Sequence, residues 1–145
     1  MRQPFRLTDH FTLEEFERSE TAHRLGIDNQ VPAYLIPAVR TLCVEVLEPL
    51  RQAMDRPILI TSGYRCPALN RAVSGQANSQ HLRGEAADIC LPSIPEGQVW
   101  YRWLMNNVNL DQLIWERQGN RRWIHVSCRV NPERNRHQVF SHVTN

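Results

Sequence analysis

Two short segments of the sequence contain side chains that could bind one metal ion together. In the first, Ser79 to Asp88, His81 precedes Asp88 by seven residues and Gly84 lies between them. A His and an Asp at this separation cannot chelate one ion from a single regular helix face. Chelation instead requires His81 in a loop, a turn at Gly84, where glycine accepts a positive φ without steric cost, and Asp88 directed inward from a following strand. The small Ala86 would leave room beside the ion.

The second segment, Arg122 to Ser127, has the pattern of a β-strand. Because side chains alternate along a strand, Trp123, His125 and Ser127 share one face, and the apolar residues between them face the core. Two imidazoles and one carboxylate form a typical catalytic zinc set with an open fourth position. Zinc there lowers the pKa of a water molecule to roughly 7 and polarises a substrate carbonyl. The sequence therefore predicts a zinc site formed by His81, Asp88 and His125.

Glu116 could supply the proton transfer that amide hydrolysis needs. It follows the predicted strand over residues 112–115, from which a hairpin could place it beside the water that attacks the amide. Each residue alone also has an ordinary interpretation: a hydrogen-bonded or surface histidine, an Asp88 that caps a turn, or a solvated Glu116 at a strand end. Their combination in two tight segments favours the metal site.

Positioning these side chains requires helices followed by strands. A capping-box pattern that begins at Thr12 predicts a short helix through Phe16. An apolar stripe at helical spacing predicts a longer helix over residues 33–54, which Pro49 should kink or shorten. We further expect strands over 57–61, 86–91, 112–115 and 123–127, a loop over 117–122, helices over 67–73 and 98–106, and an edge strand over 134–140. This order predicts an α+β fold with a small central antiparallel sheet and flanking helices.

Length and composition indicate one domain over residues 1–145. A net charge of +2 is too small to indicate nucleic-acid binding, and no apolar run is long enough for membrane insertion. The first residues lack the apolar stretch of a signal peptide. The four cysteines form no C-x-x-C pair, and we expect them to be reduced and mostly buried. A disulfide between Cys90 and Cys128 stays open as an alternative.

The two segments resemble the paired motif of the zinc D-alanyl-D-alanine peptidases. This family includes cell-wall carboxypeptidases, vancomycin-resistance dipeptidases and phage endolysins, and the hedgehog signalling domain shares its fold. The resemblance extends over about residues 11–139 and implies that zinc binds His81, Asp88 and His125. The matching motifs are Ser79-x-His81-x-x-Gly84-x-Ala86-x-Asp88, Trp123-Ile124-His125-Val126, the turn Ser62-Gly63-Tyr64-Arg65, and Asn70.

The resemblance also implies the identity of the general base. Several members of the family carry the catalytic acid three residues before the second His, where this sequence has Arg122, which cannot be a general base. Other members have a Glu on the preceding strand, and Trp115-Glu116 matches that version. We therefore assign the base to Glu116, with Glu85 as the fallback.

Two further residues match positions near the substrate in the family. Arg65 would orient the carboxylate or carbonyl of the substrate, and Ser79 would lie close to the peptide. A structural ion pair for Arg65 and a loop cap for Ser79 stay open as alternatives. The remaining histidines fall outside the motifs and are expected on the surface or in loops: His10, His23, His137 and His142.

The resemblance implies a zinc peptidase that hydrolyses peptidoglycan stem peptide, either at D-Ala-D-Ala or at an L-Ala-D-Glu bond. The sequence does not decide between these bonds. The alternatives are a non-catalytic zinc module that binds the cell wall or a protein partner, and a phage tail or assembly-associated domain. We expect a monomer. Because no signal peptide is seen, we also expect the protein to be cytoplasmic until its release, or phage-associated, and to act on the cell wall.

Overall fold

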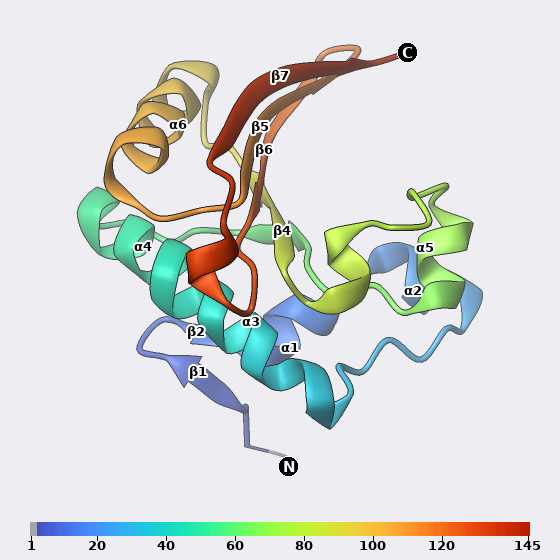
Figure 1. Ribbon diagram of the computed structural model, residues 1–145. Helices are drawn as coiled ribbons and strands as arrows, with labels where there is room; N and C mark the ends of the chain where they lie inside the picture. Colours follow the sequence, from blue (N-terminus) through green and yellow to red (C-terminus); the bar gives the residue numbers. More distant parts are fainter. Residues whose placement is uncertain (1–2) are drawn as a thin grey trace.

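The computed structural model describes residues 3–145 and combines helices with two sheets (Figure 1). The helices are α1 (Leu13–Glu17), α2 (Glu20–Leu25), α3 (Ile36–Leu42), α4 (Glu48–Met54), α5 (Pro67–Ala72) and α6 (Ile94–Asn107). The strands are β1 (Arg6–Thr8), β2 (Phe11–Thr12), β3 (Ile60–Ser62), β4 (Ala86–Cys90), β5 (Gln112–Gln118), β6 (Arg121–Ser127) and β7 (Gln138–Thr144). The described residues also form three 3₁₀ turns, η1 (Ala33–Leu35), η3 (Gln80–Arg83) and η4 (Pro132–Arg134), and one π-helical turn, η2 (Cys43–Leu47). The predicted α+β class is confirmed.

The main sheet has the strand order β3-β4-β6-β5-β7. Its first four strands are antiparallel, as expected, but the edge strand β7 runs parallel to β5. The parallel direction of β7 follows from the path of residues 128–137, which connect β6 to β7. These residues return the chain to the start of β5, where the backbone N–H of His137 donates to the carbonyl of Leu110 and the backbone N–H of Gln138 donates to the carbonyl of Asp111.

The β5–β6 hairpin is longer than predicted. Residues 117–122 were expected as a polar loop, whereas the strands extend to Gln118 and resume at Arg121, which leaves a two-residue turn at Gly119. Gly119 has a φ of 59°, which glycine adopts at little cost. The hairpin tip is exposed, so its strands need no apolar side chains. The edge strand β7 also differs from the prediction, because it begins at residue 138 rather than at residue 134.

The helical run over residues 33–54 was predicted to be kinked or shortened by Pro49; it is not shortened, because it continues to Met54. Proline has no N–H to donate, and its ring clashes with the carbonyl four residues earlier. The π-helical turn Cys43–Leu47, just before Pro49, interrupts the regular α-helical hydrogen bonding there.

Helix α6 is longer than predicted, because it begins at Ile94 rather than at residue 98. The Ser93 hydroxyl caps its start by accepting from the N–H of Glu96.

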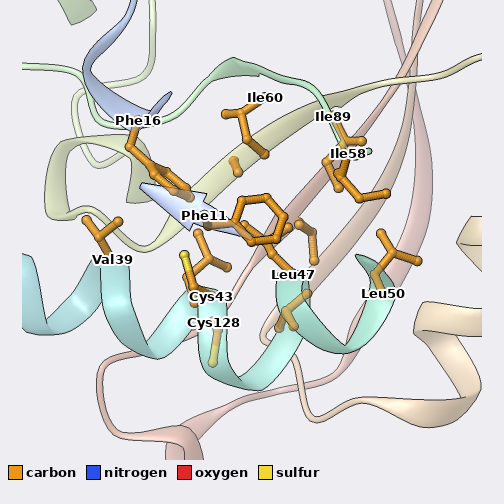
Figure 2. Packing of buried hydrophobic residues seen from close by; sticks show 14 of the residues in the cluster. Phe11, Phe16, Val39, Cys43, Leu47, Leu50, Ile58, Ile60, Ile89 and Cys128 are labelled. Atoms are coloured by element: carbon orange, nitrogen blue, oxygen red, sulfur yellow. The ribbon is translucent and has the colours of Figure 1, made fainter. Parts of the chain in front are cut away.

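The hydrophobic core lies between the α3–α4 run and one face of the main sheet. Figure 2 shows Val39, Cys43, Leu47 and Leu50 pointing from this run toward Phe11, Phe16, Ile58, Ile60 and Ile89. The capping box at Thr12 is present as predicted and fixes the helix that carries Phe16. Trp100 and Leu104 of α6 belong to the same core. In Figure 1, α6 lies on one side of the sheet, and α2, α5 and the η3 turn lie on the other.

The cysteines are all free, and only Cys43 and Cys128 are buried. Cys66 is half-buried and Cys90 is exposed, so the expectation of mostly buried thiols holds for two of them. Burial raises the pKa of the Cys43 thiol above its ordinary value. The alternative disulfide between Cys90 and Cys128 is not formed. Among residues 3–145, no helix combines the length and apolar character needed to cross a membrane.

Candidate metal centre

The structure brings His81, Asp88 and His125 together with their ligand atoms within 4.8 Å of one another. The Oδ1 atom of Asp88 lies 3.0 Å from Nδ1 of His125 and 3.4 Å from Nε2 of His81. Ligand bonds of about 2.0–2.1 Å in a tetrahedral zinc site separate neighbouring donor atoms by roughly 3.3 Å. Two imidazole nitrogens and a carboxylate oxygen at these separations fit one zinc ion.

His81 is presented by the η3 turn, not by a strand or a long helix. The Ser79 hydroxyl accepts from the backbone N–H of His81 at the start of this turn, and Gly84 ends it with a φ of 70°. The His81 Nδ1–H donates to the carbonyl of Gly63 at 2.7 Å, which fixes the ring and leaves Nε2 for a metal. A Cβ on Gly63 would lie 2.7 Å from Cα of Phe16, so this close approach requires glycine.

Asp88 and His125 face each other across two neighbouring strands. They are directly paired in the antiparallel β4–β6 ladder, and paired residues project to the same face of a sheet. Ala86 pairs with Ser127 one step further along that face, and both are buried. The alternation predicted for Trp123, His125 and Ser127 therefore places His125 on the face that is turned away from the core.

The protonation states of two of these residues suit a metal ion. Burial lowers the pKa of His81, which favours the neutral imidazole that binds a metal. Burial by itself would raise the pKa of Asp88. The positive charge that His81 carries once it is protonated at low pH, and the hydrogen bond from His125, outweigh that effect and hold the Asp88 pKa well below its ordinary value. Asp88 is thus a carboxylate beside a neutral His81 at pH 7.

Glu116 lies on the same face of the sheet, one strand further on. It pairs with Trp123 in the β5–β6 ladder, two residues from His125, and lines the same cavity as the three candidate ligands. Its side chain is only 14% exposed. Its Oε2 atom lies 3.0 Å from Nδ1 of His142, a β7 residue that the sequence had placed on the surface. His142 is indeed exposed, and only the register of the parallel edge strand reveals its contact with Glu116.

Arg65 is held at the rim of the site by neutral side chains. Its Nε donates to the Ser62 hydroxyl and its Nη1 to Oδ1 of Asn70, both at 3.2 Å. Asn70 is fixed in turn by donating to the carbonyl of Gln76. The Nη2 atom lies 3.7 Å from Asp88, which leaves the ion pair looser than a direct hydrogen bond. The guanidinium therefore stays available to a ligand in the cavity.

The other residues considered from the sequence have different surroundings. Ser79 lines the cavity, as expected for a residue near the substrate. Its hydroxyl also caps the η3 turn, which was the alternative interpretation. Glu85 is buried, and its carboxylate accepts from Arg83 and from the backbone N–H of Val130, so the fallback base is occupied elsewhere. Arg122 donates to backbone carbonyls at the hairpin tip. His10, His23 and His137 are exposed.

Two adjoining cavities form one groove across the sheet face. The larger, about 640 Å³, contains the candidate ligands and Glu116 and extends to β7. The second, about 560 Å³, extends toward α2 and β3. Both share Arg65, Val73, Asp88 and Trp123 in their walls. The groove therefore continues on both sides of Asp88.

Most of this sequence is similar to a known protein family. The family model of peptidase M15 matches residues 9–127, which include the three candidate ligands, Arg65, Ser79 and Glu116. A curated relative, the zinc D-Ala-D-Ala carboxypeptidase of Streptomyces albus G, is 33% identical over 81 residues. The aligned part is 55% of this chain and 31% of that protein, so the chain corresponds to less than a third of the relative. Strand β7 lies outside the family match.

Proposed function

This chain belongs to the peptidase M15 family, and from that premise we propose that it is a zinc metallopeptidase that hydrolyses a peptide bond in peptidoglycan stem peptide. The observation that carries the proposal is the meeting of two histidines and one aspartate, from two separate segments, in a groove that also contains Glu116. The zinc named for the Streptomyces albus G carboxypeptidase supports the choice of metal.

His81 Nε2, Asp88 Oδ1 and His125 Nδ1 would hold the zinc ion. Bound zinc polarises the substrate carbonyl and makes a water molecule more acidic. The chain's own contribution is to fix the three donors. The Gly63 carbonyl orients His81, and the β4–β6 pairing orients Asp88 against His125. Two neutral imidazoles and one carboxylate leave a net positive centre, which favours the negative charge that develops on the amide oxygen.

Glu116 would act as the general base. Its carboxylate lies on the groove wall, and in this role it accepts a proton from the attacking water and passes it to the leaving amine. Arg65 would hold a carboxylate or carbonyl of the peptide, because it lines both cavities and its guanidinium can bind such groups through two parallel hydrogen bonds. Ser79, on the same wall, would contact the peptide backbone.

The shape of the groove favours an internal bond of the stem peptide. A carboxypeptidase has to accommodate only one residue beyond the scissile bond, whereas this groove continues past Asp88 in both directions. The relative's name instead describes cleavage at D-Ala-D-Ala. The two bonds release products of different mass, so one experiment separates them.

The test is release of muropeptides from purified peptidoglycan, followed by mass spectrometry, with zinc supplied. Wild type should release peptides, and Glu116→Gln should reduce the rate by at least roughly 100-fold because the amide cannot take up a proton. Glu133→Gln makes the same change at an exposed site outside the groove and should behave as wild type. Stoichiometric zinc with no release from several wall types would favour the non-catalytic module instead.

The cellular location, the monomeric state, the single-domain organisation and a phage or prophage origin stay predictions. Genes for a holin or for phage tail proteins beside the coding gene would support release at lysis or transport on a phage particle. A phage assembly role would instead require co-purification with virion components.

A further inference from the structure

Strand β7 adds a wall to the groove from beyond the segment that the family model matches. Its seven residues pair in parallel with β5, from Gln112 opposite Gln138 to Gln118 opposite Thr144. In this register Glu116 lies opposite His142. The side chains of alternate β7 residues therefore line the groove on the outer side of Glu116, among them Phe140, His142 and Thr144.

His142 makes a specific contact with the proposed base. Its Nδ1 lies 3.0 Å from Oε2 of Glu116. An ionised carboxylate can only accept hydrogen bonds, so Nδ1 carries the proton in this pair. The contact occupies Oε2 and leaves Oε1 without a side-chain partner among the described residues, so Oε1 can accept a proton from water.

The position of His142 is set by the fold and not by an isolated loop. The backbone N–H of Gln138 donates to the carbonyl of Asp111 at 2.8 Å, which sets the register at the start of β7. The Tyr101 hydroxyl donates to the carbonyl of Phe140 and links the strand to α6. A glutamate side chain has three rotatable bonds, and a hydrogen bond from a residue whose backbone is held in β7 restricts them.

We propose that His142 is a positioning residue that holds the Glu116 carboxylate in the orientation needed for proton transfer. The proposal rests on the proposed function, because it assumes that Glu116 is the base. It assigns a role to the C-terminal strand, which carries none of the motif residues. His142 acts through Glu116 and does not itself contact the scissile bond.

The experiment compares two substitutions of nearly equal shape. Asn can place an N–H close to the position of Nδ1, whereas Leu cannot donate a hydrogen bond. We expect His142→Leu to lower kcat roughly tenfold with KM unchanged, and His142→Asn to stay within about threefold of wild type. Zinc content and melting temperature should match wild type in both variants. His23→Leu, on the exposed surface of α2, is the control for loss of a surface imidazole and should leave kcat unchanged.

Equal kcat for His142→Leu and wild type would overturn the proposal, and so would equal losses in the Leu and Asn variants. If wild type releases no peptide, the proposed function fails, and the contact is then tested without activity. Imidazole ¹⁵N chemical shifts at pH 7.5 should show His142 protonated at Nδ1 in wild type, with that tautomer depleted in Glu116→Ala. Identical shifts in the two proteins would show that His142 does not position Glu116.

Discussion

Asp88 and His125 are directly paired across β4 and β6, and their side chains meet with a 3.0 Å separation between Oδ1 and Nδ1. Two ligands of the candidate site are thus fixed by the regular ladder of the sheet. Only the third, His81, depends on an irregular turn. The ladder makes the pair rigid, and the turn makes the site sensitive to changes near His81.

Removal of either paired ligand should abolish stable metal binding. Asp88→Asn replaces the charged donor with a weak neutral one and His125→Ala leaves two donors, so we expect zinc affinity to fall by more than roughly 100-fold, since even outer-shell changes cost 10- to 100-fold. Isothermal titration calorimetry with zinc on apoprotein prepared with a chelator measures this loss. His137→Ala, outside the groove, should bind zinc as wild type does. Unchanged affinity in Asp88→Asn would place the zinc elsewhere.

Gly63→Ala should weaken the site indirectly. An added Cβ would lie 2.7 Å from Cα of Phe16, so the backbone must shift, and the Gly63 carbonyl would move away from His81. We expect a loss of about 1–3 kcal/mol in unfolding free energy, as for an overpacked core, and zinc affinity about tenfold weaker. Chemical denaturation and zinc titration measure the two effects. A destabilised variant with full zinc affinity would show that the Gly63 carbonyl does not orient His81.

Zinc affinity should depend on pH through the two imidazoles. Burial lowers the pKa of His81, so its neutral form persists to lower pH than for a free histidine. Zinc binds only neutral imidazoles, so affinity should be highest near neutral pH and decline on the acid side. Peptide release should decline over the same range. Unchanged zinc affinity at pH 5 and pH 7.5 would argue against two histidine ligands.

Asp111, which lies outside the metal centre, should make the stability of the fold depend on pH in the acid range. Its carboxylate is fully buried, and burial would raise its pKa, but hydrogen bonds from Arg136 and the charges of Arg136 and Arg129 lower it to about 2. A lowered carboxyl pKa stabilises the fold above pH 3.8, and the stabilisation is lost as pH falls through about 2. The shift corresponds to about 2 kcal/mol.

Asp111→Asn should therefore unfold more easily than wild type at pH 7, and the difference should shrink as the pH approaches 2. Urea denaturation at a series of pH values measures it. The same gap in unfolding free energy at pH 2.5 and pH 7 would show that the ionised carboxylate is not the stabilising group.

The meeting of the three candidate ligands could be predicted from the sequence because the position of each depends on local rules. Strand alternation placed His125 on the groove face, and the glycine at position 84 marked the turn after His81. The contact between His142 and Glu116 could not be predicted in this way. It depends on the parallel register between β5 and β7, which brings together two residues that are 26 positions apart in the sequence. No short-range pattern encodes that register.

Two of the differences from prediction have a clear physical reason. Polar residues near Gly119 indicated a loop, but an exposed hairpin tip forms strands without burying side chains. Pro49 indicated a kink or a shorter helix, and the structure instead has a π-helical turn before Pro49 and a helix that continues to Met54. The tight hairpin turn at Gly119 and the π-helical turn before Pro49 are changes in backbone conformation that amino-acid composition does not reveal.

The central claim is that one zinc ion is held jointly by His81, Asp88 and His125. The most direct test is a crystal structure of the zinc-loaded protein with diffraction recorded on either side of the zinc absorption edge. We expect one anomalous peak within about 2.0–2.2 Å of His81 Nε2, an Asp88 carboxylate oxygen and His125 Nδ1. A peak at another set of residues, or none at these three in zinc-saturated crystals, would contradict it.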